Sequence, residues 1–299
     1  MNAQPHNQRH GIVAALGAFS FWGVLPIYFK WIAVVPPLEI IANRILWSIP
    51  VLAGFLLLRD GPGFWRRMLL PRRTVLGLLV SGALVVSNWL LFVWAVNDGH
   101  ILATSLGYFI NPLLSVLLGF LFLGERLTVI QCIAVGIAAA GTMYLGWFFG
   151  VAPWISLALA LTFGLYGLAR KKLNVGPMIG LLWETLLMAI PAVFYLVWTS
   201  AHTGLAYGNA SLRIDVLLVL AGVITVLPLV WFNVAAHILP LSWVGLFQYI
   251  SPTITFLLAV FFYGEVFTRG HAVAFACIWC AAALVTGESV LRARRQRTA

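Results

Sequence analysis

Polar side chains recur at helical spacing inside one long apolar run of this 299-residue chain. Ser105, Tyr108, Asn111 and Ser115 are separated by three or four residues, so they share one face of a helix. Hydroxyl and amide groups on such a face can bind a small solute by hydrogen bonds. Packing between helices is an equally good interpretation of any single buried amide, because amides also join helices in lipid.

The same pattern returns 140 residues later, where Gln248, Ser251 and Thr255 take the matching positions. Two further apolar runs contain Asn88 and Asn233. Polar groups from four helices predict a common cavity, and aromatic rings would give it walls suited to planar or amphipathic solutes. For each aromatic residue, packing or lipid contact is the alternative. The expected solute-binding residues are Trp22, Asn88, Trp89, Tyr108, Asn111, Ser115, Tyr166, Asn233, Gln248, Tyr249, Ser251 and Thr255.

Two prolines within these runs, Pro112 and Pro252, are gating candidates. Proline lacks an amide hydrogen, so it frees the carbonyl four residues earlier, here that of Tyr108 or Gln248. Non-helical backbone at this depth is tolerated only inside the protein or beside a water-filled cavity. A kink that only shapes packing is the alternative.

Ionisable side chains are rare in the runs, and Arg44 and Glu184 are further candidates for gating or coupling. A charge inside a membrane is costly and is a functional hypothesis by default. Glu184 would carry a coupling proton if burial favours its neutral form, whereas exposure at the interface would make it an ordinary carboxylate. For Arg44 the alternatives are extension to the outer interface or pairing with Glu39.

The composition places these helices in a bilayer. The chain is 62% hydrophobic and 9% charged, with a mean hydropathy of +1.00, whereas soluble domains are about a quarter charged. A soluble enzyme is excluded, and so is a barrel, because runs such as 113–123 are apolar without alternation. We predict an all-α integral membrane protein with ten transmembrane helices, at about 11–32, 38–58, 74–95, 101–122, 129–148, 152–170, 178–198, 214–235, 243–263 and 271–290.

Charge and cysteine patterns bear on orientation and partners. Fourteen of the 18 Lys and Arg residues fall on the side of the N-terminus and three on the other side, so both termini are predicted to be cytoplasmic. Because these charges occupy short loops and do not line one face, we expect no nucleic-acid partner. The expected partners are the lipid bilayer and a small-molecule substrate. The three cysteines lie in apolar runs and predict no metal site. We also expect no cofactor and no catalytic residue, since the sequence contains no catalytic motif or dyad.

An internal repeat relates the two halves of the chain. Segment 106–125 aligns with segment 246–265 without a gap, and eight of the twenty positions are identical. The identities include a proline within the run and a Gly-Glu pair at its end. The same offset pairs Gly82 with Gly222.

Each copy contains five predicted helices, an odd number, so the second copy enters the membrane from the opposite side. We therefore predict two inverted-topology repeats, residues 1–148 and residues 149–299, the second with a basic cytoplasmic tail. Such repeats are typical of secondary transporters, which open a midplane site to either side in turn. A duplicated bundle without transport is the alternative.

Turn motifs end the fourth and ninth predicted helices. Gly124-Glu125 and Gly264-Glu265 are followed by Thr128 and Thr268. Glycine supplies a helix stop, while Glu and Thr are expected to cap the following helix. A gating role for the acids is the alternative.

The fifth and tenth predicted helices carry little internal polarity, so we expect them to form a peripheral scaffold or a subunit contact. Small residues permit close helix packing in lipid. The pattern allows a homodimer through Gly136, Ala140, Ala272, Ala276 and Cys280.

The motifs at this spacing resemble those of a known family. They are similar to the EamA-type permeases of the drug/metabolite transporter superfamily, and to its RarD-like branch, which is related to bacterial amino acid exporters. The resemblance covers nearly the whole chain. It implies a multi-pass carrier of the bacterial inner membrane, usually an exporter, with a cavity lined by the third, fourth, eighth and ninth helices. The motifs are NWLLFVWAVN (88–97), SLGYFINPL (105–113), FLGER (122–126), FQYISPT (247–253) and FYGE (262–265).

The expected function is export of small organic metabolites by alternating access. Aromatic or other neutral amino acids come first, because the proposed cavity offers amides, hydroxyls and rings without a dense charge cluster. The resemblance also implies an amphenicol-type drug permease as an alternative. Two other classes of protein are further alternatives. An intramembrane enzyme would need a metal cluster, an activated nucleophile or paired acids. A passive channel would differ from a carrier because its flux would not saturate or show trans-stimulation.

Overall fold

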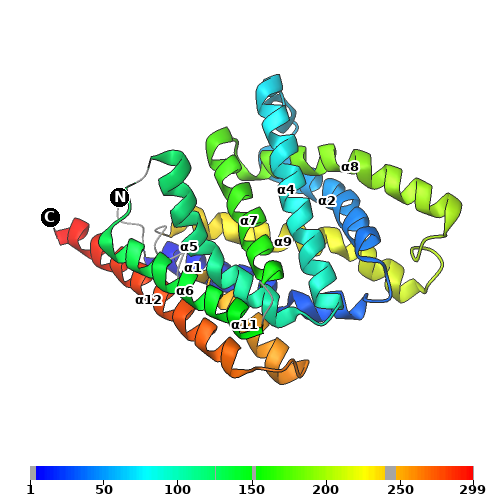
Figure 1. Cartoon of the computed structure of the whole chain (residues 1–299). Helices are drawn as coiled ribbons and strands as arrows, with labels where there is room; N and C mark the ends of the chain where they lie inside the picture. The colour runs from blue at the N-terminus through cyan, green and yellow to red at the C-terminus, as the bar shows by residue number, and fades with distance from the viewer. Residues whose placement is uncertain (1–4, 125, 150–152, 240–246, 299) are drawn as a thin grey trace. The chain divides into compact units, whose positions relative to one another are not determined.

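The computed structural model describes residues 5–124, 126–149, 153–239 and 247–298, and all regular structure in these ranges is helical, as predicted (Figure 1). Each predicted span except the ninth corresponds to one helix. The elements are α1 (Pro5–Trp31), α2 (Pro37–Asp60), α3 (Phe64–Arg67), α4 (Arg72–Asn97), α5 (Ile101–Leu123), α6 (Val129–Phe149), α7 (Trp154–Leu173), α8 (Pro177–His202), α9 (Leu212–Ile238), α11 (Ile250–Leu257), a π-helical turn η1 (Leu258–Phe262) and α12 (Arg269–Thr298).

Eight of the described helices are long and apolar enough to cross a membrane: α1, α2, α4, α5, α6, α8, α9 and α12. The chain is therefore a multi-pass membrane protein. Helix α7 has 20 residues, and its last turn carries three basic side chains. The predicted span 243–263 corresponds to the shorter apolar helix Ile250–Phe262, and residues 243–246 lie outside the described ranges. The count of ten spans, the inverted repeats and the cytoplasmic termini remain predictions.

The chain near Pro252 differs from the single helix predicted there. Helix α11 begins at Ile250, directly after a turn at Gln248 and Tyr249, so Pro252 lies in the first helical turn and not in mid-helix. Proline is tolerated at this place because the first amides of a helix have no partner within it. Helix α5, by contrast, continues through Pro112.

The chain forms two compact units, and each takes helices from both sequence halves. The first unit contains α5, α6, α11 and α12, and the second contains α2, α3, α4 and α8. Helices α1, α7 and α9 contribute to both units, so the units do not follow the sequence halves. Unit 1 consists of Met1–Pro26, Asp98–Gly164 and Trp231–Ala299, and unit 2 of Ile27–Asn97 and Leu165–Val230.

In unit 1, α6 lies along α12 and α5 packs against α11 (Figure 1). A Cβ atom at Gly141 would lie 2.6 Å from Cβ of Cys277, so glycine allows α6 to approach α12 this closely. The small residues expected at a homodimer contact are not used in this packing. They are all exposed: Gly136, Ala140, Ala272, Ala276 and Cys280.

In unit 2, an apolar core joins α2, α3 and α8. Leu52 and Leu56 of α2 pack in one buried cluster with Phe64 of α3 and Leu182 of α8. The short helix α3, which the sequence pattern did not predict, thereby fixes the connection between α2 and α4 to the core.

Glycines that the repeat relates lie at contacts between helices of the two sequence halves. In unit 2, Gly222 of α9 lies against the backbone of Trp47 in α2, and Gly82 of α4 lies against Glu184 in α8. The two glycines are 140 residues apart in the sequence. Both contacts bring a helix of one half onto a helix of the other half.

Unit 1 contains a second such pair. A Cβ at Gly23 would lie 2.7 Å from Cβ of Ile254, and a Cβ at Gly164 would lie 2.9 Å from a methyl carbon of Leu118 and 3.3 Å from one of Leu114. Gly23 and Gly164, like Leu114 and Ile254, are related by an offset of 140 or 141 residues.

The predicted turn chemistry is confirmed for both glycines and both threonines. Gly124 and Gly264 have φ of 67° and 68°, the left-handed conformation that ends a helix without a steric penalty. The hydroxyl oxygens of Thr128 and Thr268 accept hydrogen bonds from the main-chain amides of Gln131 and His271, at the starts of α6 and α12.

Glu265 caps a different helix from the one expected. Its carboxylate accepts the amides of Ile101 at 2.6 Å and Leu102 at 2.8 Å, at the start of α5 and not of α12. The reason is tertiary, because the 264–268 turn lies at the positive end of α5 within unit 1. Glu125 lies outside the described residues.

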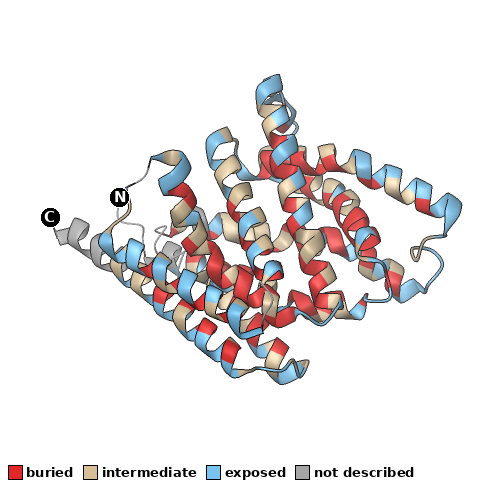
Figure 2. Ribbon diagram, in the orientation of Figure 1, coloured by how far each residue is buried: buried red, intermediate tan, exposed pale blue. Residues whose placement is uncertain are grey.

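Exposed residues occur along the helices (Figure 2), and many of them are large and apolar. Met143 and Trp147 of α6 are 69% and 79% exposed, and Phe194 of α8 is 74% exposed. In water such surfaces would mark an interaction site, and on membrane helices they are the expected contact with lipid tails.

Candidate functional site

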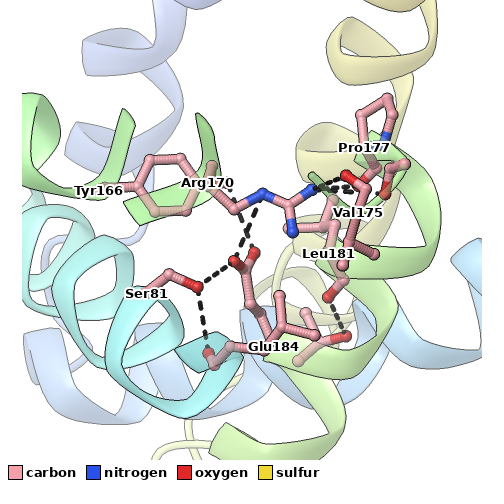
Figure 3. A network of polar contacts seen from close by, with 10 residues as sticks. Ser81, Tyr166, Arg170, Val175, Pro177, Leu181 and Glu184 are labelled. Carbon is pink, nitrogen blue, oxygen red and sulfur yellow. Dashed lines mark hydrogen bonds and ion pairs between the residues drawn. The ribbon is translucent and has the colours of Figure 1, made fainter. Parts of the chain in front are cut away.

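A buried carboxylate lies in unit 2 between α4, α7 and α8 (Figure 3). Glu184 is 1% exposed, so the exposed alternative for this residue is wrong. The Ser81 hydroxyl donates to Oε1 at 2.6 Å, and the Tyr166 hydroxyl donates to Oε2 at 3.4 Å. Nε of Arg170 lies 3.7 Å from Oε1. The carboxylate therefore has two hydroxyls and one guanidinium around it.

Arg170 reaches this carboxylate from the end of α7 (Figure 3). Its Nη2 donates to the carbonyls of residues 175–177 at 3.3 to 3.4 Å, which fixes the α7–α8 turn. Its Nη1 is buried and has no hydrogen-bond partner among the described residues. A Cβ at Gly180 would overlap the guanidinium, so glycine at this position of α8 leaves room for the Arg170 side chain.

From the sequence, Arg170 is one of the fourteen basic residues predicted to lie on the cytoplasmic side, and no contact is predicted for it. Its four-residue spacing from Tyr166 is the signal that could have placed both side chains on one face of α7. Ser81 was also missed, although its neighbour Gly82 was recognised as a repeat position.

A buried cation lies elsewhere in unit 2. Arg44 is 6% exposed, so it does not extend to the interface. Its guanidinium carbon lies 4.1 Å from the centroid of the Trp89 ring, and its Nε donates to Oγ1 of Thr225 at 2.7 Å. A desolvated cation–π contact of this kind is worth about 2 kcal/mol. The Glu39 carboxylate accepts the amides of Ala206 and Tyr207, which anchors the loop after α8.

In unit 1, polar contacts gather around Pro252. Ser105 of α5 donates to the Pro252 carbonyl at 2.8 Å, and Thr255 of α11 donates to the Gly23 carbonyl at 3.2 Å. The Tyr249 ring stacks on Phe109 of α5, with centroids 6.0 Å apart. Hydroxyls of α5 and α11 thus donate to main-chain carbonyls of other helices in unit 1.

Asn111 is the polar residue of α5 with an unfilled hydrogen-bonding capacity. It is 2% exposed, and its Oδ1 has no hydrogen-bond partner among the described residues. Leaving such an acceptor empty costs about 1–3 kcal/mol. A bound solute or water with an N–H or O–H group would remove this cost.

The other residues expected in unit 1 vary in their surroundings. The Trp22 ring packs edge-on against Phe19, and Tyr108 packs edge-on against Phe163. Asn233, Gln248 and Ser251 are half-buried. Ser115 is exposed, and its hydroxyl donates to the Asn111 carbonyl of its own helix.

The structure divides the predicted site residues between the two units, and the single cavity predicted from them remains a prediction. Asn88 is fully buried in unit 2. Unit 2 contains Arg44, Asn88, Trp89, Tyr166 and Glu184; unit 1 contains Trp22, Tyr108, Asn111, Pro112, Ser115, Asn233, Gln248, Tyr249, Ser251, Pro252 and Thr255.

Comparison with known proteins gives full-length matches. A family model described as the EamA-like transporter family matches residues 9–147 and again residues 152–287. A protein of Vibrio cholerae serotype O1 named "Uncharacterized transporter" is 44% identical, over 100% of this chain and 99% of that protein. "Protein RarD" of Salmonella typhi is 43% identical, over 96% of this chain and 98% of that protein.

Two further similarities are more distant. "Chloramphenicol-sensitive protein RarD" of Pseudomonas aeruginosa is 32% identical, with 96% of each chain covered. A solved structure titled "Crystal structure of protein" matches with a TM-score of 0.61 and 19% identity, over 94% of this chain and 98% of the other. That last likeness concerns the fold alone.

Proposed function

Because the chain belongs to the EamA-like transporter family, we propose that this transporter exports small organic metabolites across the bacterial inner membrane by alternating access. Neutral amino acids, aromatic ones included, are the first candidates. The Asn111 carboxamide carries this proposal. It supplies a buried acceptor without a partner among the described residues, and an ammonium or amide group of the solute would fill it.

Aromatic rings near the break before α11 support the same class of solute. Tyr249 stacks on Phe109 in unit 1, and Trp22 contacts Phe232 in the same unit. Rings with a few polar groups are typical of pockets for small amphipathic molecules. A neutral amino acid combines an apolar side chain with donors that the Asn111 oxygen can accept.

Two observations support an alternating mechanism built on inverted repeats. The family model matches the chain twice, once in each half. Gly82 and Gly222, which the repeat relates, each lie against a helix of the other sequence half. Two related halves of opposite orientation can exchange conformations, and this exchange would open a midplane site to either side.

Counterflow in proteoliposomes tests the proposal. Vesicles loaded with an unlabelled neutral amino acid should accumulate the labelled amino acid transiently, and the rate should saturate. Asn111→Leu should raise KM because the acceptor is lost, by about tenfold for one hydrogen bond of about 1.4 kcal/mol. Thr142→Val of α6 is the matched control, because that hydroxyl donates only to the Ala138 carbonyl of its own helix.

Absence of counterflow across a broad amino acid panel would refute amino acid export. A second candidate, an amphenicol permease, is favoured by the name of the Pseudomonas aeruginosa relative. Chloramphenicol in the same vesicles separates the two, since the amphenicol permease would carry labelled chloramphenicol and the amino acid exporter would not. Flux without saturation or trans-stimulation would instead identify a channel.

A further inference from the structure

Two glutamates of unit 2 are equally buried but have different kinds of partners. Glu39 and Glu184 are each 1% exposed. The carboxylate of Glu39 accepts main-chain amides of Ala206 and Tyr207 at 3.1 and 2.8 Å. A main-chain amide can only donate, so these partners suit an ionised carboxylate and lose a bond if a proton is added to the oxygen they bind.

The partners of Glu184 suit both protonation states. Ser81 and Tyr166 approach its two oxygens through hydroxyls, at 2.6 and 3.4 Å. A hydroxyl can donate to a carboxylate or, after rotation, accept from a carboxylic acid. Protonation of Glu184 therefore reverses a hydrogen bond and does not break it.

The hydrogen count at Ser81 favours this reversal. Its single hydroxyl hydrogen has two acceptors within reach, Oε1 of Glu184 at 2.6 Å and the Leu78 carbonyl at 3.2 Å. While Glu184 is ionised, the one hydroxyl hydrogen of Ser81 can form a good hydrogen bond to Glu184 or to Leu78, but not to both. Once Oε1 carries a proton, Glu184 donates to Ser81, and Ser81 donates to Leu78.

Arg170 also keeps partners in both states. Its Nε lies 3.7 Å from Glu184, which is an ion pair too long for a hydrogen bond, while its Nη2 binds the carbonyls of residues 175–177. A neutral Glu184 would leave the guanidinium on these carbonyls. The pair is therefore not a fixed structural bridge.

The other charged groups on the helices that pack against α8 have different neighbours. On α2, Arg44 contacts Thr225 and Trp89, Glu39 binds loop amides, and Arg59 pairs with Asp60. On α4, the charged side chains are Arg72 and Arg73 in its first turn, and on α7 Lys171 and Lys172 follow Arg170 in the last turn. Arg170 and Tyr166 are thus the ionisable groups that contact Glu184 among the described residues.

We infer that Glu184 binds and releases one proton in each transport cycle, so that solute export is driven by proton entry. This inference rests on the proposed transport function. A proton from external water forms an O–H bond with the carboxylate, and the same bond breaks to release the proton to internal water after the conformational change. Arg170 is a positioning residue that favours the ionised state and so promotes release.

Two transport measurements on the full-length protein in proteoliposomes separate coupling from exchange, with labelled phenylalanine as the probe. An imposed pH difference of one unit should drive about tenfold accumulation in the wild type for one proton per solute. Glu184→Gln should lose this accumulation and keep counterflow, which needs no gradient. Glu39→Gln is the matched buried control, and its ratio of driven accumulation to counterflow should equal that of the wild type.

The inference would be overturned, and the transport proposal left intact, if pH-driven accumulation persisted in Glu184→Gln. The same holds if the wild type showed counterflow but no accumulation driven by the pH difference. Absence of all wild-type counterflow would overturn the transport proposal. A measurement without solute then tests Glu184 alone. Infrared spectra on acidification should show a protonated carboxyl band that Glu184→Gln lacks, and a band unchanged by that substitution would overturn proton binding at Glu184.

Discussion

Gly222→Ala is the substitution for which the structure makes the sharpest prediction of instability. A Cβ at this position would overlap the Trp47 carbonyl and lie 2.9 Å from the Ser48 amide, and both are backbone atoms of α2. Backbone cannot rotate away, so the helices must separate, and overpacking of this kind costs about 1–3 kcal/mol. Gly222 and Thr225 share a face of α9, so the separation should also lengthen the Thr225–Arg44 bond.

Two other glycines supply the comparison. Gly54→Ala meets nothing within 4 Å, so it gains only the helix propensity of alanine, about 0.5–1 kcal/mol. Gly82→Ala would lie 3.4 Å from Cβ of Glu184, an ordinary contact, and should behave like Gly54→Ala to within about 0.5 kcal/mol.

Thermal unfolding in detergent ranks the variants, measured as the fraction of protein that remains in the monodisperse peak after heating. Because all three substitutions share the propensity gain, the difference between Gly222→Ala and Gly54→Ala isolates the overlap. At about 2–4 °C per kcal/mol, Gly222→Ala should melt several degrees below Gly54→Ala. Equal melting temperatures for these two variants would refute the close α2–α9 contact.

Two further substitutions probe the polar contacts. Gly180→Ala would displace the Arg170 guanidinium, which is the mobile end of a side chain, so we expect a melting temperature within a few degrees of wild type. The dependence of transport on the pH gradient should change. An unchanged response to the gradient would contradict the placement of Arg170. Glu265→Gln replaces the charged group that caps the amides of Ile101 and Leu102, and it should destabilise the protein by about 0.5–2 kcal/mol. Hydrogen exchange at the start of α5 should become faster. An exchange rate equal to that of the wild type would argue against this cap.

Patterns with a local cause could be predicted from the sequence. Apolar runs located the helices, and glycine followed by threonine located the turns before α6 and α12, because φ above zero and N-capping depend on neighbouring residues. The repeat offset also related Gly82 to Gly222 before their contacts were known.

Features with a tertiary cause were missed or misassigned. Glu265 caps α5 and not the next helix, because the partner amides lie more than 160 residues away in the sequence. Arg170 has the position of a loop charge, and only the packing of α7 beside α8 reveals its contact with Glu184.

The mixing of both sequence halves in each unit has a consequence for biosynthesis. When the ribosome has completed α5, neither unit has its full set of helices, since α8 and α12 are still to be made. Arg44 emerges 181 residues before Thr225, the hydroxyl to which it donates in the folded protein. Helix α2, which carries Arg44 in its apolar stretch, therefore lacks this hydrogen-bond partner until α9 has been synthesised.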